Sequence, residues 1–356
     1  MDTSKNARIP TLDGWRGIAI LLVLIDHVQH SCFRATRYET FSYLGQHGVT
    51  IFFVLSGYLI TSKLLSELNT TDTIDLGKFY RRRFFRLMPS AWLYLSIVTL
   101  VCIVLHSDNF GVIPALFFFR NYVGHNLLTG HFWTLSIEEQ FYLVWPAILL
   151  LLRRKAWTVA VLGCIIVCLW RIADWNILLS EHVAYSFLTQ YRADAILFGC
   201  LLALMIVRLK KMLRAWMLWP LLLAFVACIG SYHKFIPTRE SIVIALILAV
   251  TSTRPDSVLS RPLNAKWLVS LGQMSYSLYI WQEFSLIQFG GHWYIALPTL
   301  LTIIFVLGYL NYYFIEQPLN RLGHSLLEAH DCPTPPPSCS KSIVECGRDA
   351  RLRSIG

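Results

Sequence analysis

The chain has 356 residues, of which 55% are hydrophobic and only 15% are charged, and its mean hydropathy is +0.52. Soluble domains carry about 25% charged residues, and the apolar residues here form long runs, so the composition excludes an ordinary soluble enzyme and indicates a polytopic membrane protein. The net charge of +10 does not indicate nucleic acid as a partner, because the basic residues cluster between apolar runs. There they set topology and meet anionic lipid or phosphate groups.

Ten apolar segments predict an all-α bundle of about ten transmembrane helices. The segments cover roughly residues 13–32, 47–65, 88–105, 135–152, 156–171, 193–207, 215–231, 240–252, 267–287 and 294–315. If the N-terminus is cytoplasmic, the cytoplasmic segments carry 22 Lys and Arg residues and the outer loops carry 7. This bias satisfies the positive-inside rule, so we expect a multi-pass membrane protein with both termini in the cytoplasm.

The end of the chain has a different composition. Four prolines between positions 333 and 337 precede mixed charges with little apolar content. This predicts a membrane domain over 1–323 and a disordered cytoplasmic tail over 324–356. The cysteine spacing matches no zinc site, so no metal is predicted. No internal repeat is evident, which argues against a transporter built from inverted repeats.

Charged residues stand inside the first apolar segment, where burial of an ionisable group is costly and indicates function. Eleven positions separate Arg16 from His27, close to three helical turns, so the two share a helix face about 16 Å apart. Arg16 is a fixed cation suited to phosphate, and His27 can take a proton near neutral pH. Asp26 lies about 100° round the helix from His27 and is not expected to orient its ring. The alternatives are an Arg16 that snorkels to the interface and a His27 that packs in the core.

Four arginines in FYRRRFFRLMP precede the third apolar segment, at positions 81, 82, 83 and 86. Arg83 and Arg86 are three residues apart and share a helix face. Guanidinium groups suit phosphate oxygens, and coenzyme A carries several phosphates, so these arginines are candidate ligands for an acyl-CoA donor. The alternative is that they only hold this loop in the cytoplasm.

Acidic and aromatic residues mark the entry to the fourth apolar segment, in HFWTLSIEEQFY. Glu138 and Tyr142 are four residues apart and share a helix face, and Trp133 precedes them. Aromatic rings stack on sugars and carboxylates accept hydrogen bonds from sugar hydroxyls, so these are candidate acceptor ligands. The alternative is an aromatic belt with an interfacial carboxylate. Histidines in the outer loops or segment ends are expected to be solvated rather than catalytic: His47, His125 and His131.

Seven ordered stretches resemble acyltransferase family 3, the integral-membrane O-acyltransferases. They are IPTLDGWRGIAILLVLIDH, FFVLSGYLIT, FYRRRFFRLMP, FWTLSIEEQFYLVWP, YRADAILFG, LGQMSYSLYIWQ and FIEQPLNRLG. They run from about residue 9 to residue 323, nearly all of the membrane portion. The resemblance implies a ten-helix fold in a bacterial inner membrane. It also implies transfer of an acetyl or related acyl group from acyl-CoA to envelope carbohydrates, Nod-factor-like glycolipids or macrolide antibiotics.

The resemblance also assigns roles. The residues that fall on the family's motifs are Arg16 and His27 (Arg-x10-His), Arg83 and Arg86 (Arg-x-x-Arg), and Glu138 with Gln140, Phe141 and Tyr142 beside it. One position departs from the pattern: many members carry histidine where this chain has Gln282. Glutamine can hydrogen-bond but cannot act as a base, which puts a histidine-dependent role there in doubt.

The sequence therefore predicts an acyl-CoA-dependent O-acyltransferase that modifies an envelope polysaccharide or glycolipid and holds no permanent cofactor. The residues expected to hold the phosphates of acetyl-CoA are Arg16, Arg82, Arg83 and Arg86. His27 is the expected general base, and Glu138 is expected to orient His27 or to bind the acceptor. The other expected acceptor ligands are Trp133, Gln140 and Tyr142. An acyl-histidine intermediate is a variant of this chemistry, and a transporter or flippase for an anionic or glycolipid substrate is the alternative function.

Overall fold

The computed structural model describes residues 9–32, 44–106, 111–123, 128–174, 187–228, 236–258, 260–286 and 293–331. Helices make up most of this part of the chain and it contains no strand, so the predicted all-α class is confirmed for it. The α-helices are α1 (Pro10–Cys32), α2 (Leu44–Thr71), α3 (Leu76–Val104), α4 (Val112–Leu116), α5 (Phe132–Leu151), α6 (Ala156–Ala173), α8 (Thr189–Met212), α9 (Leu218–Cys228), α10 (Ile236–Thr253), α11 (Lys266–Gln273), α12 (Ser275–Trp281), α13 (Trp293–Asn311) and α14 (Gln317–Asp331). The 3-10 segments are η3 (Arg120–Tyr122), η4 (Arg153–Lys155), η6 (Ala215–Met217), η7 (Arg261–Asn264) and η8 (Gln282–Leu286), and η9 (Tyr312–Glu316) is a π-helix.

Each predicted apolar segment coincides with at least one helix, but three differ in form. Helix α3 begins at Leu76, well before the predicted start at 88, because the arginines are good helix formers and Asp75 caps the end by accepting from the Lys78 N–H at 2.8 Å. The predicted segment 267–287 is divided at Met274 into α11 and α12. Helix α13 continues through η9 into α14, which passes the predicted boundary at 323 and ends at Asp331.

Four of the described helical stretches are long and apolar enough to cross a membrane by themselves. They are Leu44–Thr71, Leu76–Val104, Arg153–Ala173 and Leu297–Leu326. Large apolar side chains also point outward from the bundle, among them Leu100 and Ile103 on α3, Ile166 on α6 and Leu223 on α9. Outward apolar faces suit a lipid environment and not water, so the structure agrees with a membrane protein.

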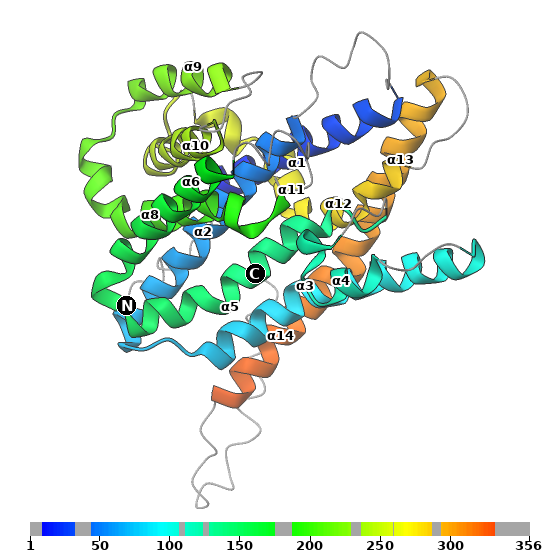
Figure 1. Ribbon diagram of the computed structural model, residues 1–356, viewed down its shortest axis with the longest axis horizontal. Coiled ribbons are helices and arrows are strands. Elements are labelled where there is room, and N and C mark those ends of the chain that lie inside the picture. The colour runs from blue at the N-terminus through cyan, green and yellow to red at the C-terminus, as the bar shows by residue number, and fades with distance from the viewer. Residues whose placement is uncertain are drawn as a thin grey trace, which may run out of the picture.

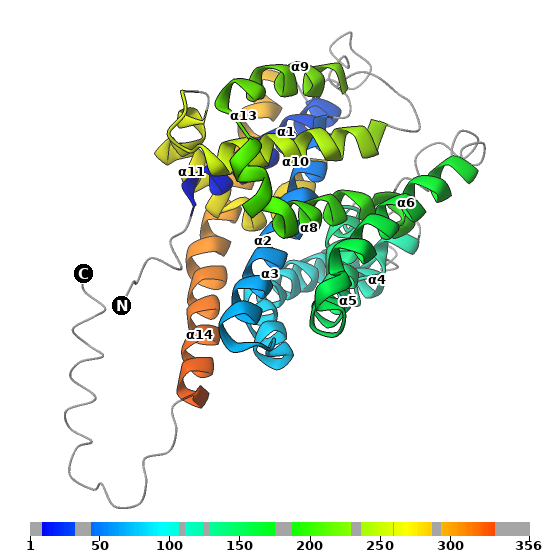
Figure 2. The same cartoon turned by 90° about the vertical axis from the view of Figure 1, so that its left-hand side faces the viewer.

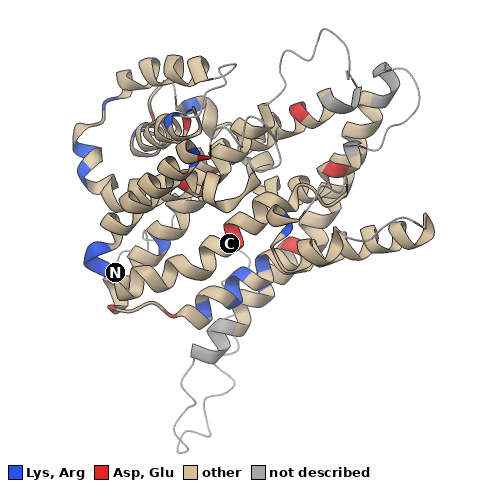
Figure 3. Cartoon of the chain, in the orientation of Figure 1, with Lys and Arg blue, Asp and Glu red and all other residues tan. Residues whose placement is uncertain are grey.

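The helices form one bundle around α1 and α2. Helix α1 packs against α2 and α11, α2 against α8, and α8 against α6 and α10, while α3 packs against α14. Helices α9 and α14 lie at opposite ends of the molecule in both views (Figures 1 and 2). Lys and Arg residues concentrate along the first half of α3, while its second half is uncharged (Figure 3).

Paired glycines allow α2 and α8 to touch backbone to backbone. A Cβ on Gly57 would lie 2.0 Å from the Ile196 carbonyl oxygen, and one on Gly199 would lie 2.1 Å from the Val54 carbonyl oxygen. Small residues at helix crossings bring membrane helices into close contact. This crossing fixes the position of α2, which supplies one wall of the cavity described below.

We expect Gly57→Ala to destabilise the protein by about 1–3 kcal/mol, because the added methyl forces α2 and α8 apart. Thermal unfolding in detergent measures this loss. Gly77→Ala is the matched control, since its Cβ would meet only the Asp75 Oδ1, at an ordinary 3.4 Å. Equal melting temperatures for the two variants would contradict the assigned packing.

Candidate active site

An elongated cavity of about 180 Å³ lies between α1, α2, α3, α5 and α12. Its α2 wall runs from Val49 to Lys63, fourteen residues or about 21 Å of helix. The side chains that line it are those of Arg16, Val49, Phe52, Phe53, Ser56, Leu59, Ile60, Lys63, Arg83, Arg86, Leu87, Thr134, Leu135, Glu138, Tyr142, Ser275, Tyr276 and Tyr279. We call the end at Lys63, Arg83 and Arg86 the cationic end, and the end at Thr134 and Tyr279 the hydroxyl end.

Arg83 is tied down at the cationic end by α5. Its Nε donates to Glu139 Oε1 at 2.8 Å, and its Nη2 lies 2.7 Å from the same oxygen and 3.9 Å from Glu138 Oε2. The guanidinium carbon also lies 3.3 Å above the centre of the Tyr142 ring, a cation–π contact. Because two carboxylates already neutralise it, Arg83 organises the wall more than it attracts a new anion.

Lys63 and Arg86 supply the accessible positive charge. Both line the cavity, and both side chains are exposed, so they stand at an open mouth. Arg16 also lines the cavity, with its Nη1 3.3 Å from Asp13 Oδ1 of the preceding helical turn. The mouth therefore presents an accessible lysine and an accessible arginine to any anion that approaches it.

Glu138 lies between the two ends. Its Oε1 accepts a hydrogen bond from the Ser56 hydroxyl at 2.7 Å, and its Oε2 faces Arg83. The structure therefore places Glu138 with α2 and α3 and gives its carboxylate a position on the cavity wall.

Two hydroxyl groups meet at the other end. The Thr134 and Tyr279 oxygens are 2.6 Å apart, and each hydroxyl is within hydrogen-bond reach of the His131 carbonyl oxygen, at 3.1 and 3.0 Å. Both side chains line the cavity. Each hydroxyl has one proton and two acceptor lone pairs, so this end can accept from a bound O–H group, and it can donate to a bound oxygen when a proton leaves the His131 carbonyl.

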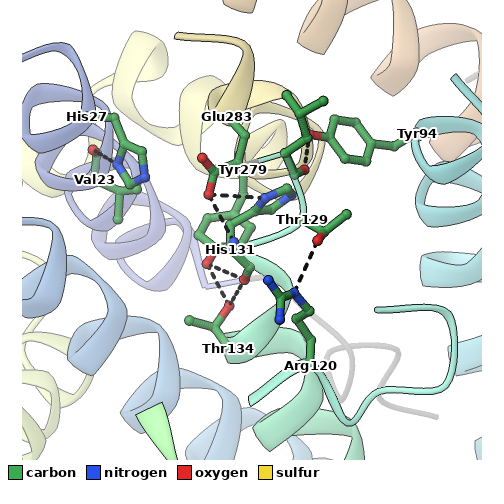
Figure 4. Close-up of polar contacts among 10 residues, drawn as sticks. Val23, His27, Tyr94, Arg120, Thr129, His131, Thr134, Tyr279 and Glu283 are labelled. Atoms are coloured by element: carbon green, nitrogen blue, oxygen red, sulfur yellow. Dashed lines mark hydrogen bonds and ion pairs between the residues drawn. The ribbon is translucent and has the colours of Figure 1, made fainter. Parts of the chain in front are cut away.

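His27 lies beyond the hydroxyl end, on α1. Its Nδ1 is 2.9 Å from the Val23 carbonyl oxygen of the same helix (Figure 4). A carbonyl only accepts hydrogen bonds, so Nδ1 carries the proton and Nε2 of the neutral ring holds the basic lone pair. Helix α1 packs against α12 and η8, which brings the helix of His27 next to the helix that carries Tyr279. A backbone carbonyl, and not Glu138, therefore sets the tautomer of His27.

Comparison with known proteins identifies the family. A model described as "Acyltransferase domain" matches residues 9–314. The chain belongs to this acyltransferase family. The sequence-based prediction of an acyltransferase is therefore confirmed at the level of the family.

The curated relatives of this acyltransferase are O-acetyltransferases by name. It is 30% identical over 371 residues to a Bacillus subtilis (strain 168) protein provisionally named peptidoglycan O-acetyltransferase YrhL. That alignment covers 90% of the chain and 56% of the relative. It is 27% identical over 359 residues to the O-acetyltransferase OatA of Staphylococcus aureus (strain NCTC 8325 / PS 47). That alignment covers 88% of the chain and 58% of the relative. The chain thus spans little more than half the length of these relatives. No solved structure matches it.

Five of the predicted site residues of the acyltransferase meet in the cavity: Arg16, Arg83, Arg86, Glu138 and Tyr142. His27 stands next to the hydroxyl end instead of on the lining. Arg82 is half-buried beside the cavity and not part of its lining, and its Nε lacks a hydrogen-bond partner among the described residues.

Two predicted acceptor ligands lie elsewhere. The Gln140 amide donates to the Phe118 carbonyl and to Asn121 Oδ1 and accepts from the Thr189 hydroxyl, so it ties η3 and α8 to α5. Trp133 packs against Phe187, with ring centres 4.7 Å apart. Neither side chain lines the cavity.

Sequence reasoning missed three groups. His131 was expected to be solvated, but its side chain is 1% exposed, and that expectation is wrong. His47 is likewise buried, with its Nδ1 2.8 Å from Glu240 Oε1, while His125 lies outside the described residues. Lys63 was not among the predicted site residues, yet it lines the cavity. Glu283 was overlooked, although a carboxylate within an apolar segment is itself a signal of function.

Proposed function

We propose that this acyltransferase moves an acetyl group from acetyl-CoA to a hydroxyl of a cell-envelope carbohydrate. One observation carries the proposal: a single elongated cavity joins accessible cations at its mouth to paired hydroxyls at its inner end. The names of the relatives support an acetyl group, and one of them supports peptidoglycan as the kind of acceptor.

The cationic end suits the donor's phosphates. Lys63 and Arg86 are accessible there, and charge-assisted hydrogen bonds to phosphate oxygens are strong. A volume of about 180 Å³ is below the range of about 300–1,000 Å³ typical for whole drug-sized ligands. We therefore place only the narrow pantetheine arm inside the cavity, with the nucleotide at the open mouth.

The hydroxyl end suits the reaction. The acceptor O–H gives its proton to Nε2 of His27 while its oxygen attacks the thioester carbonyl. The carbonyl oxygen gains the negative charge, and the hydroxyls of Thr134 and Tyr279 donate to it by turning their protons away from the His131 carbonyl oxygen. Collapse of the intermediate breaks the C–S bond, and the imidazolium of His27 returns the proton to the departing CoA thiolate. Atoms and charge then balance as an acetyl ester plus free CoA.

Glu138 lines the cavity between its two ends. Its bonds to Ser56 and its proximity to Arg83 fix the wall midway along the cavity. We assign Glu138 to alignment of the donor arm between α2 and α5. The Tyr142 ring packs against the Arg83 guanidinium and so supports the same part of the wall.

The membrane setting completes the proposal. We propose ten spans in a bacterial inner membrane, with both termini in the cytoplasm. In this orientation the mouth at Lys63 and Arg86 faces the side where acetyl-CoA is made. The positive-inside bias of 22 against 7 basic residues supports this orientation. The hydroxyl end then points towards the outer side, where an envelope carbohydrate is reached.

We expect Arg86→Ala and Lys63→Ala each to raise the KM for acetyl-CoA by about 10-fold, the loss of one charge-assisted contact, with kcat nearly unchanged. Release of free CoA thiol by purified protein in detergent, with peptidoglycan fragments as acceptor, measures both constants. S-acetyl-pantetheine, which lacks phosphate, should not distinguish the variants from the wild type. Arg81→Ala is the control, because Arg81 is exposed on the same helix but does not line the cavity. An equal effect with the phosphate-free donor would rule out phosphate binding here.

A further inference from the structure

The first turns of α2, α5 and α8 meet in a group of polar and aromatic side chains. Gln46 of α2 accepts a hydrogen bond on Oε1 from Nη2 of Arg192 of α8 at 3.0 Å. The Arg192 guanidinium carbon lies 5.9 Å from the centre of the Trp133 ring of α5. That ring also packs against the Phe187 ring, which precedes α8, with centres 4.7 Å apart. We call Gln46, Trp133, Phe187 and Arg192 the aromatic shelf.

The aromatic shelf continues the wall of the cavity. On α2, Gln46 is three residues before Val49 and seven before Phe53, so it shares a helix face with these two lining residues. The Phe53 ring meets the Trp133 ring edge to face, with centres 6.1 Å apart. Thr134, which follows Trp133 in α5, carries one of the two hydroxyls of the hydroxyl end. Phe53 therefore contacts the shelf on one side and lines the cavity on the other.

The shelf and the cationic mouth lie at opposite ends of α2. Gln46 precedes Lys63 by seventeen residues, which is about 25 Å of helix. Gln46, Trp133 and Phe187 are half-buried, so their side chains are partly accessible, while Arg192 is 7% exposed. The shelf is therefore reached from the end of the bundle opposite to the cations.

Fastening of α8 does not by itself account for the arginine. The start of α8 is already held by two other contacts, because the Thr189 hydroxyl donates to Gln140 Oε1 at 2.6 Å and Asp194 pairs with Arg171 of α6 at 3.0 Å. An arginine inside an apolar bundle is costly and is by default a sign of ligand binding. A third polar contact made by Arg192 at the same place points to such a role.

The composition of the shelf suits a sugar ring. The apolar C–H face of a sugar packs on aromatic faces such as those of Trp133 and Phe187. The hydroxyl and acetamido oxygens around its edge accept hydrogen bonds from a guanidinium, which presents five N–H donors in fixed directions, and a glutamine amide both donates and accepts. A few polar groups beside aromatic walls are typical of small-molecule sites.

We propose that the aromatic shelf is the subsite that binds a sugar ring of the carbohydrate acceptor. Trp133 and Phe187 take the C–H face of the ring, and Gln46 and Arg192 take the oxygens at its edge. A sugar bound there lies beside Phe53, next to the hydroxyl end where the thioester reacts. This subsite rests on the proposed function for the identity of the acceptor, but sugar binding is measured without acetyl transfer.

The direct test is the binding of soluble disaccharide-peptide fragments of peptidoglycan to purified protein in detergent, followed by NMR titration of the fragment signals. Trp133→Leu keeps apolar volume against Phe53 and Phe187 but removes the flat ring, so it should raise the Kd of the fragment about 10-fold. Trp133→Phe keeps a flat ring and should change this Kd by less than about 3-fold. The Kd of acetyl-CoA should be the same in both variants and the wild type.

Two further variants complete the test. Arg192→Gln should raise the Kd of the fragment about 10-fold, the loss of a hydrogen bond from a charged group. Trp157→Leu is the matched control, because Trp157 of α6 is 56% exposed and belongs neither to the shelf nor to the cavity lining. It should bind the fragment as the wild type does.

Several results would overturn the proposal. They are a wild-type protein that binds no fragment, and equal Kd values for the wild type, Trp133→Leu and Arg192→Gln. If Trp133→Leu and Arg192→Gln do not fold, an unchanged Kd in Gln46→Ala with a wild-type melting temperature overturns it. Acetyl transfer with an unchanged acceptor KM in Trp133→Leu would reject this subsite and keep the proposed function. Binding that depends on the Trp133 ring, in a protein with no acetyl transfer, would keep the subsite and reject the proposed function.

Discussion

Replacement of His27 with glutamine is expected to lower kcat for acetyl transfer by about 10²–10⁴-fold, the usual contribution of a general base. The side-chain amide can still bond to the Val23 carbonyl, which now receives Nδ1–H at 2.9 Å, so the helix should remain intact. What is lost is the basic lone pair of Nε2. Single-turnover release of CoA thiol in the presence of acceptor measures the chemical step.

Two comparisons make this test specific. Acetyl-CoA binding should be unchanged in His27→Gln, because the cations lie at the other end of the cavity. His47→Gln, a change in a buried histidine outside the cavity, should retain kcat within a few-fold. A His27→Gln variant with near-wild-type kcat would remove the general base from the account.

Replacement of Arg83 with alanine is expected to destabilise the protein by about 3–5 kcal/mol, because it leaves a buried charge cluster without its cation. Arg83 bonds to Glu139, faces Glu138 and covers the Tyr142 ring. Arg83→Lys should recover little, since an ammonium group cannot reproduce the fork or the stacked plane. Thermal unfolding in detergent with and without acetyl-CoA measures the effect.

A double variant separates this structural role from donor binding. Arg83→Met with Glu139→Gln should be more stable than Arg83→Met alone, because residues in one network are coupled. Arg86→Ala, by contrast, should melt close to the wild type, since its side chain is exposed at the mouth. Equal stability of Arg83→Ala and Arg86→Ala would contradict the structural role of Arg83 and the donor-binding role of Arg86.

The sequence predicted four of the five charged residues that line the cavity, because helix periodicity is a local property. Glu138 and Tyr142 are four residues apart and do share the face that lines the cavity. The same rule could have excluded Gln140, which lies about 200° round the helix from Glu138 and does point to η3 and α8. Periodicity states which residues share a face, but not which neighbouring helix meets that face.

Long-range contacts were beyond the sequence. Glu283 meets His131 across 152 positions, and no local pattern links η8 to the start of α5. For the fold, the apolar segments were predictable from hydropathy. The division of 267–287 at Met274 and the π-turn at Tyr312–Glu316 were not, because such irregularities depend on how a helix packs against its neighbours.

The most direct test of the central claim is to follow an isotope-labelled acetyl group from acetyl-CoA to peptidoglycan fragments by mass spectrometry. Purified wild-type protein and His27→Gln would be compared in liposomes with acetyl-CoA on the side of Lys63 and Arg86. We expect labelled O-acetyl ester on the carbohydrate and an equal amount of free CoA with the wild type, and neither with His27→Gln. Carbohydrate that crosses the membrane chemically unchanged, with the thioester intact, would contradict acyl transfer and would make this protein a transporter.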